Sequence, residues 1–245
     1  MLSYKGTRYH GWQIQPNALT IQEVLTNDIS TILGEKISLT GCGRTDAGVH
    51  ARQYFAHFDT NRDNLEKDPH LIFKLNGKLP EDISIHKIYR VGNEDHARYS
   101  ALSRTYEYHI SRIKDPFLKE FSHYIYGELD FKSMNSASKL LLGTSDFTSF
   151  SRVDNESNSS ICNVQHAIWD VKPERMIFTI TADRFLRNMV RAIVGTLLEV
   201  GFGKISVQDF KNIIQEKDRS EAGTSAPAKG LFLTEIIYPP EIVLK

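Results

Sequence analysis

The residues best suited to chemistry lie in the short segment GCGRTDAGVH, residues 41–50. Two glycines, Gly43 and Gly48, flank Asp46, and glycine lets a backbone approach a ligand closely. The carboxylate of Asp46 could therefore serve as a nucleophile or as a general base. An aspartate in a glycine-rich turn more often only stabilises the turn, so the segment by itself leaves both interpretations open. Its pattern differs from that of phosphate-binding loops and of the nucleophile elbow of hydrolases.

Arginines that could assist such a carboxylate occur in the apolar stretch RFLRNMVRAIVGTLLEVG, residues 184–201. Its apolar residues recur at helical spacing, which predicts a long and largely buried helix. Arg184, Arg187 and Arg191 would share one side of this helix and form a local basic patch. A guanidinium close to a carboxylate favours its ionised form. Arg191 could equally take part in a structural ion pair at the surface.

The composition of the 245 residues is that of an ordinary globular protein, with 40% hydrophobic and 24% charged residues. Lys and Arg together number 30, as do Asp and Glu, so any affinity for a polyanion must come from locally clustered charge. The two cysteines, Cys42 and Cys162, have no partners at metal-ligand spacing, which favours a reducing, cytoplasmic setting. No apolar run reaches the length of about 18 residues that a membrane span needs, so we expect no membrane partner.

The elements that would position these residues are helices and strands in alternation. A capping box at Thr20 predicts a helix that ends at Gly34, and the segments 36–43 and 51–60 on either side of the Asp46 loop have the pattern of strands. In the strand expected at 103–112, Tyr106 and Tyr108 alternate with polar residues. Further strands are predicted at 83–91, 164–171, 175–182 and 231–239, and further helices at 71–75, 131–142 and after Ser206.

This pattern predicts an α+β fold of two halves, residues 1–112 with the Asp46 loop and residues 113–245 with the arginine helix and the closing strand. No low-complexity linker separates the halves. We therefore expect the two halves to share one continuous sheet.

Five stretches together resemble the bacterial tRNA pseudouridine synthase A family in their order and spacing, and the likeness spans nearly the whole chain. They are YKGTRYHGWQIQPN, GRTDAGVHA, HARYSALSRTYEY, FLRNMVRAIVGTLLEVG and KDRSEAGTSAPAKGLFL. The resemblance implies an isomerase that converts uridines at positions 38 to 40 of the tRNA anticodon arm to pseudouridine. It also implies that no cofactor or metal takes part, and that the fold has two similar halves, a mainly antiparallel sheet and a central active-site cleft.

The resemblance also implies roles for five residues. Asp46 corresponds to the catalytic aspartate. Arg191 corresponds to the arginine that pairs with it, and Arg44 resembles an arginine that contacts the target nucleotide. Tyr106 matches the tyrosine that stacks on the uracil, and Leu231 resembles the apolar residue that closes the other side of the base. Without the resemblance, Leu231 would be assigned to the core.

Partners and alternatives follow from the same likeness. The expected partners are the tRNA anticodon arm and a second copy of the chain in a homodimer. The alternative function is a non-catalytic module of the same fold that binds tRNA and helps it to fold. N-glycoside hydrolysis is less favoured because no second carboxylate lies close to Asp46 in the sequence. Two positions depart from the family pattern: Arg187 stands where a histidine is common, and Cys162 where an arginine is common.

Overall fold

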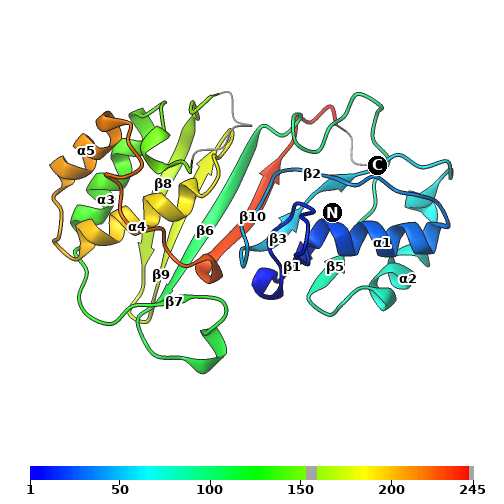
Figure 1. The fold of residues 1–245 in the computed structure, drawn as a ribbon, viewed down its shortest axis with the longest axis horizontal. Helices are drawn as coiled ribbons and strands as arrows, with labels where there is room; N and C mark the ends of the chain where they lie inside the picture. The colour runs from blue at the N-terminus through cyan, green and yellow to red at the C-terminus, as the bar shows by residue number, and fades with distance from the viewer. Residues whose placement is uncertain (153–158, 243–245) are drawn as a thin grey trace. The chain divides into compact units, whose positions relative to one another are not determined.

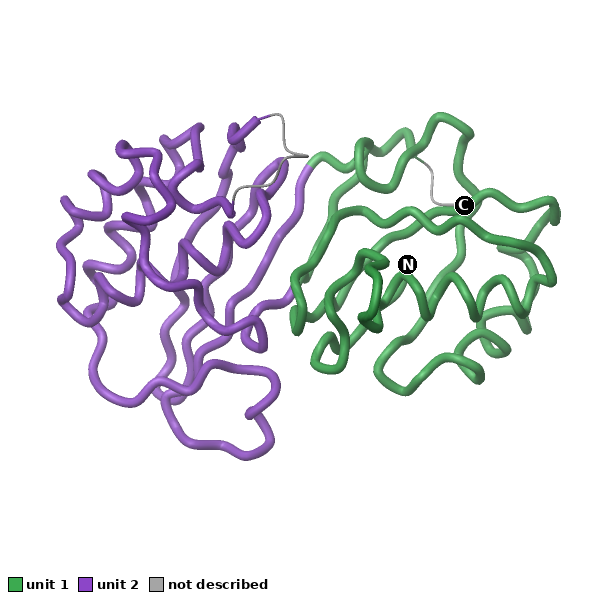
Figure 2. Tube along the Cα trace, in the orientation of Figure 1, with its two compact units in different colours: residues 1–102, 233–245 green, residues 103–232 purple. Residues whose placement is uncertain are grey.

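The computed structural model describes residues 1–152 and 159–242 and has an α+β architecture (Figure 1). The chain forms two compact units, which Figure 2 distinguishes by colour: residues 1–102 with 233–245, and residues 103–232. These boundaries differ from the predicted division after residue 112. Strand β6 (Ser103–Ser111) pairs along its whole length with β9 (Arg175–Ala182), so it belongs to the second unit. The division at residue 233 falls within β10 (Leu231–Ile237), which carries the chain back into the first unit.

The first unit combines helices with antiparallel strands. Strand β1 pairs with both β5 and β3, so Leu2 lies opposite Ile85 on one side and opposite Tyr54 on the other. Beyond β3 lie the residues of β10 that belong to this unit. The bounds are α1 (Ile21–Leu33), α2 (Leu71–Lys78), β1 (Leu2–Tyr4), β3 (His50–Tyr54), β5 (Ile83–Ile85) and a separate small ladder of β2 (Thr40–Gly41) with β4 (Ala56–His57).

The predicted first helix is confirmed as α1, with both of its ends. The hydroxyl of Thr20 accepts a hydrogen bond from the backbone N–H of Glu23 at 3.4 Å, which caps the helix start. Gly34 ends the helix in the left-handed conformation, with φ of 69°. The buried residues recur at helical spacing, so one face packs inward as expected: Ile21, Leu25, Ile29 and Leu33.

Strands near the Asp46 loop are shorter than predicted. Only Thr40–Gly41 of the segment 36–43 is strand, the segment 51–60 is divided between β3 and β4, and 83–91 keeps only Ile83–Ile85. Packed aromatic rings form the core close to these short strands. Trp12 stacks on Tyr54 with ring centroids 4.2 Å apart, and Tyr4 packs against Tyr54 at 5.5 Å. All three rings are buried, so they fix the segments that carry them.

The second unit places helices on one side of the sheet β6-β9-β8 (Figure 1). The hairpin predicted at 164–171 and 175–182 is confirmed as β8 (Val164–Val171) and β9. Strand β7 (His123–Tyr124) pairs with the other edge of β6. The helices are α3 (Phe131–Leu140), α4 (Met189–Gly201) and α5 (Val207–Glu216), and α3 contacts α4, α5 and β8. Short 3-10 helices occur at Gly6–Arg8, Leu65–Lys67, Pro116–Leu118, Leu141–Gly143, Thr148–Phe150 and Ala228–Gly230.

Helix α4 is largely buried, as predicted, but it begins at Met189 rather than at residue 184. Asn188 adopts a left-handed conformation with φ of 66°, which prevents a helix from running through this position. Arg184 and Arg187 therefore precede the helix, and the prediction that they share one helical side with Arg191 is wrong. Across the described residues, no helix combines the length and apolar character needed to cross a membrane.

Candidate active site

Asp46 lies in the loop that joins β2 to β3 in the first unit. The backbone carbonyl of Asp46 accepts a hydrogen bond from Val49 N–H at 3.2 Å, which closes a tight turn. Gly48 provides the left-handed conformation that this turn needs, with φ of 80°. Asp46 itself is half-buried, whereas Arg44 and Ala47 are exposed. The loop thus presents the carboxylate from a backbone of defined shape.

The first residues of the chain hold this loop in place. The N–H of Trp12 donates to the carbonyl of Thr45, and the N–H of Gly48 donates to the carbonyl of Tyr9, both at 3.2 Å. The hydroxyls of Tyr4 and Thr45 hydrogen-bond to each other at 2.9 Å in the buried interior. These hydrogen bonds are made to Thr45 and Gly48, which lie on either side of Asp46. The position of the carboxylate therefore depends on residues more than thirty positions earlier in the sequence.

Gly6 and Gly11 allow the backbone of the first twelve residues to lie close to the backbone of the Asp46 loop. A Cβ atom at Gly11 would lie 2.3 Å from the carbonyl oxygen of Thr45, and one at Gly6 would lie 2.0 Å from that of Val49. Gly11 also has φ of 87°, which side chains of L-residues rarely adopt. No role for Gly6 or Gly11 was predicted from the sequence. The available signal was two glycines within a segment rich in aromatic residues, YKGTRYHGW.

Hydrogen bonds also fix the residues at the two ends of the loop. Cys42 N–H donates to Phe55 carbonyl at 2.9 Å, and the hydroxyl of Tyr54 donates to the carbonyl of Gly43. His50 is buried, and its Nδ1 accepts a hydrogen bond from Gly6 N–H at 3.1 Å. This accepted bond gives His50 a structural role next to the loop.

In the second unit, Arg191 occupies the first turn of α4 and is held by the segment before β10. Its Nε donates to the carbonyl of Ala226 at 2.8 Å, and the N–H of Ala226 donates back to the carbonyl of Arg191 at 2.9 Å. A Cβ at Gly195 would lie 1.9 Å from the carbonyl oxygen of Thr224, so only glycine allows the helix to pack this closely. The guanidinium of Arg191 therefore extends from a rigid support.

The tyrosines of β6 differ in their surroundings. Tyr108 is buried, and its hydroxyl donates to the carbonyl of Pro227 at 2.9 Å. Burial raises the pKa of Tyr108 above its ordinary value, and the positive charge of Arg191 opposes this rise. Tyr106 is only half-buried, and its ring meets Phe185 edge to face, with centroids 5.1 Å apart. Tyr108 thus belongs to the core, and Tyr106 keeps an accessible surface.

The remaining predicted positions also have defined surroundings. Leu231 begins β10 and is buried. Cys162 is buried too, and burial raises the pKa of its thiol to about 12, so it remains a neutral thiol at physiological pH. Asp46 and Arg44 thus lie in the first unit, and Tyr106, Arg191 and Leu231 lie in the second.

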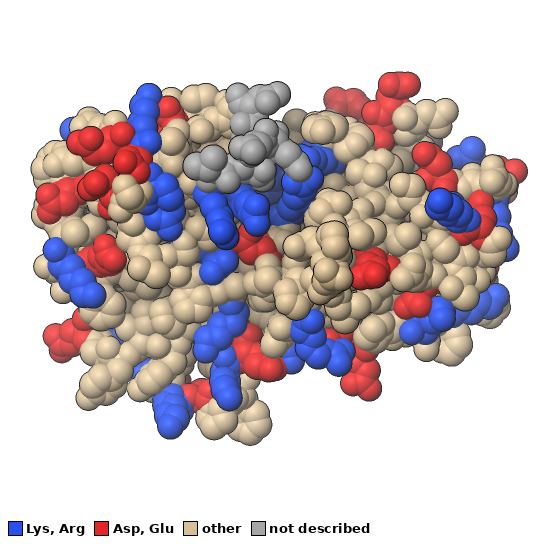
Figure 3. Space-filling model, viewed as in Figure 1, with Lys and Arg blue, Asp and Glu red and all other residues tan. Residues whose placement is uncertain are grey.

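Charge is distributed unevenly over the second unit although the whole chain is neutral. Figure 3 shows blue side chains gathered over the start of α4 and red ones around α5. Basic side chains are thus concentrated over one part of this unit and acidic side chains over another. The described residues hold no group of three His, Cys, Asp or Glu side chains placed to bind a metal ion.

We predict that Gly11→Ala displaces the Asp46 loop, because the added methyl group overlaps the carbonyl of Thr45 and φ becomes strained. Urea unfolding should show a loss of about 1 to 3 kcal/mol, and amide exchange at residues 45–49 should become faster. Gly77→Ala in α2 is the control, because a Cβ there meets nothing within 4 Å. Equal stability and equal exchange in the Gly11 and Gly77 variants would contradict this account.

Comparison with known proteins agrees with the arrangement of these motifs. The family model described as tRNA pseudouridine synthase matches residues 1–100 and 137–239. The tRNA pseudouridine synthase A of Bacteroides fragilis is 51% identical over 242 residues, which cover 98% of this chain and 96% of that protein. The proteins of the same name from Parabacteroides distasonis and Acetivibrio thermocellus are 47% and 40% identical, over 98% and 97% of this chain and 95% and 98% of their own lengths. The chain therefore belongs to the tRNA pseudouridine synthase family.

Proposed function

We propose that this protein converts uridine to pseudouridine at positions 38 to 40 of the tRNA anticodon arm. The observation that carries the proposal is the Asp46 loop, in which one carboxylate is presented by a backbone held from both sides. A catalytic carboxylate needs such a fixed position, because reacting groups must be held close to their productive geometry. An aspartate that only stabilises a turn does not need it. Membership of the family supplies the reaction and the class of RNA.

The reaction needs little beyond a carboxylate and a surface for the base. The bond between N1 of the uracil and C1′ of the ribose breaks, the uracil turns, and C5 joins C1′. The proton on C5 is then lost and N1 gains one, so atoms and charge balance without a redox partner. Asp46 can add to C1′ as a nucleophile, or it can remove the 2′ proton and give a glycal intermediate. Both routes need Asp46 in its ionised form.

Arg191 is proposed to keep Asp46 ionised when bound RNA excludes water from the carboxylate. A guanidinium favours the charged form of a nearby carboxylate, and the effect grows where water is excluded. The support for Arg191 is its fixed position at the start of α4, where its Nε is held by Ala226. Arg44, which is exposed and lies two residues before Asp46, is proposed to contact the target nucleotide.

Tyr106 and Leu231 are proposed to hold the uracil after it leaves the RNA stack. A base inside a stem is inaccessible to a carboxylate, so the enzyme must flip it out against planar or apolar surface. The half-buried ring of Tyr106, supported by Phe185, offers such a surface. Leu231 is an apolar side chain of the same unit at the start of β10.

The test is release of tritium from C5-labelled uridine in an unmodified tRNA transcript, with the product located by sequencing. Wild-type protein should release tritium and modify the anticodon arm. Asp46→Asn keeps the shape of the side chain but removes its charge, so turnover should fall by roughly 10⁴-fold or more. Asp63→Asn, an exposed aspartate in the same unit, is the control and should keep full activity. Tight tRNA binding without release by the wild type would favour the alternative, a non-catalytic tRNA-binding module.

We predict that Tyr106→Phe keeps most of its affinity for tRNA, because the ring provides the stacking surface and the hydroxyl does not. Binding measured by filter retention and turnover measured by tritium release separate the two contributions. Wild-type affinity together with complete loss of turnover would show that the hydroxyl takes part in proton transfer from C5.

We propose that the protein is a cytoplasmic homodimer in which each subunit supports an anticodon arm bound by the other. Light scattering at micromolar concentration should then give twice the mass of the 245-residue chain. A monomeric mass under these conditions would contradict this part of the proposal.

A further inference from the structure

The turn from His96 to Ser100 in the first unit is held by several hydrogen bonds, although Arg98 and Tyr99 within it are exposed. The N–H of His96 donates to the hydroxyl of Ser100, and the N–H of Ser100 donates to the carbonyl of His96, both at 3.0 Å. Nδ1 of His96 accepts from the N–H groups of Arg98 and Tyr99, at 3.0 and 3.3 Å. The turn therefore has a single well-defined backbone shape.

A residue of β4 and the residue that follows β10 also hold this turn. Nδ1 of His57 on β4 accepts from Ala97 N–H at 3.2 Å, and the hydroxyl of Tyr238 donates to the carbonyl of Ala97 at 2.6 Å. Burial and the nearby His96 lower the pKa of His57, which favours the neutral ring that this accepted bond requires. The turn is thus part of the rigid body of the unit.

This rigid turn holds a large aromatic ring in solvent. Tyr99 is 75% exposed, although its backbone is fixed. Its ring rests against the ring of His96, with centroids 4.4 Å apart, and the guanidinium of Arg98 lies 5.6 Å from its centroid. An exposed aromatic ring on a preorganised support is the arrangement with which proteins stack unpaired bases.

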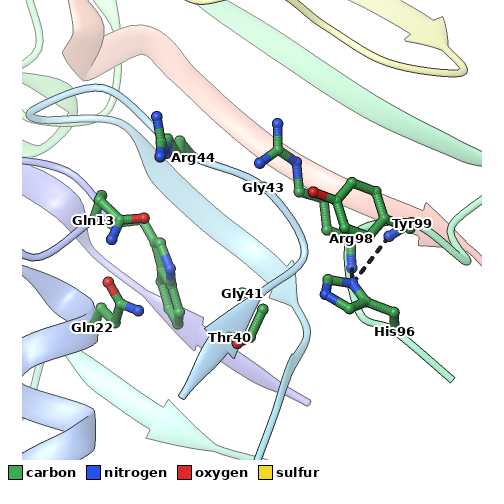
Figure 4. Close-up of a pocket in the computed structure, with 10 residues that line it drawn as sticks. Gln13, Gln22, Thr40, Gly41, Gly43, Arg44, His96, Arg98 and Tyr99 are labelled. Atoms are coloured by element: carbon green, nitrogen blue, oxygen red, sulfur yellow. Dashed lines mark hydrogen bonds between the residues drawn. The ribbon is translucent and has the colours of Figure 1, made fainter. Parts of the chain in front are cut away.

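Tyr99 borders a pocket with a volume of 210 Å³, shown in Figure 4. Arg44, Gln13 and Gln22 lie on one side of it, and Arg98, Tyr99 and His96 lie on the other. Among the ten residues of the described chain that line the pocket, two are arginines and none is Asp or Glu. The lining is therefore suited to an anion with a planar group attached. The other lining residues are Trp12, Thr40, Gly41 and Gly43.

Size and position narrow the ligand to one nucleotide of the RNA. The volume is below the roughly 300 to 1,000 Å³ of sites that take drug-sized molecules, so it suits a single base. Gly43 and Arg44 line the pocket, and Gly43 is three residues from Asp46, which places their Cα atoms at most about 11 Å apart. The nucleotide next to one bound at Asp46 is therefore within reach of this pocket.

We propose that the pocket binds the nucleotide that directly flanks the target uridine. Its base stacks on Tyr99, and Arg98 binds its phosphate group; Arg44, which also lines the pocket, binds the phosphate that joins it to the target nucleotide. This inference rests on the proposed function, because it takes Asp46 to mark the position of the target. The flanking nucleotide would then be unstacked together with the target, and the pocket would compensate for the lost stacking.

The test compares anticodon stem-loop RNAs in which the nucleotide on the 5′ side or on the 3′ side of the target is replaced by an abasic unit. With wild-type protein, one of the two replacements should lower kcat/KM by about tenfold or more. Tyr99→Ala should lower kcat/KM for the intact RNA by a similar factor and should show no further loss with that abasic RNA. Tyr126→Ala, which removes a tyrosine that is 85% exposed in the second unit, should behave as wild type. Equal losses from the abasic unit in wild type and in Tyr99→Ala would overturn the proposal.

A second readout does not depend on turnover. 2-Aminopurine placed at the flanking position, in RNA bound to the Asp46→Asn variant, should change its fluorescence on binding. This change should vanish when Tyr99→Ala is added. If wild-type protein releases no tritium but the Tyr99-dependent change is present, the proposed function fails and the pocket stands. If binding occurs without a Tyr99-dependent change at either flank, the pocket proposal is overturned whatever the turnover.

Discussion

Close contact between two backbone segments, the one around Gly11 and the one around Thr45, is the constraint on which the site depends. Backbone groups can approach so closely only where no Cβ intervenes, and Gly11 and Gly6 meet that condition. Hydrogen bonds from Trp12 and to Tyr9 then fix the loop on both sides of Asp46. The buried stack of Trp12 on Tyr54 holds the opening segment in turn. A carboxylate on a mobile loop would lose the orientation that catalysis needs, and this packing prevents such motion.

In the second unit, a glycine also allows close backbone packing next to a charged side chain. Gly195 lets α4 contact the backbone at Thr224, and the neighbouring Ala226 binds both the backbone and the Nε of Arg191. Each charged group is thus carried by a backbone that a glycine brings close to another segment. This arrangement allows a chain with no net charge to present strong local charge, because position rather than abundance determines the field at the site.

Local signals were sufficient to predict the elements whose ends are fixed by their own residues. The Thr20 cap and Gly34 define α1, and alternation in β8 and β9 defines their hairpin. Elements that depend on distant contacts could not be found in this way. The apolar pattern before Met189 continues that of α4, yet Asn188 interrupts the helix, and the strands predicted at 36–43 and 51–60 keep only short ladders. The motif was sufficient to propose the loop residue Asp46 as a site residue, whereas the role of Gly11 and the exposed turn at Tyr99 require knowledge of which segments meet in space.

The positioning role of the Asp46 loop can be tested by the single-turnover rate of Asp46→Glu on an anticodon stem-loop, with enzyme in excess and RNA saturated. This change keeps the charge and moves the carboxylate by one methylene group, so it isolates position from chemistry. If the loop fixes the carboxylate at its working position, the rate should fall by about 100-fold or more while the Kd for RNA stays the same. A rate within about threefold of the wild type would show that the loop does not fix the position of the carboxylate.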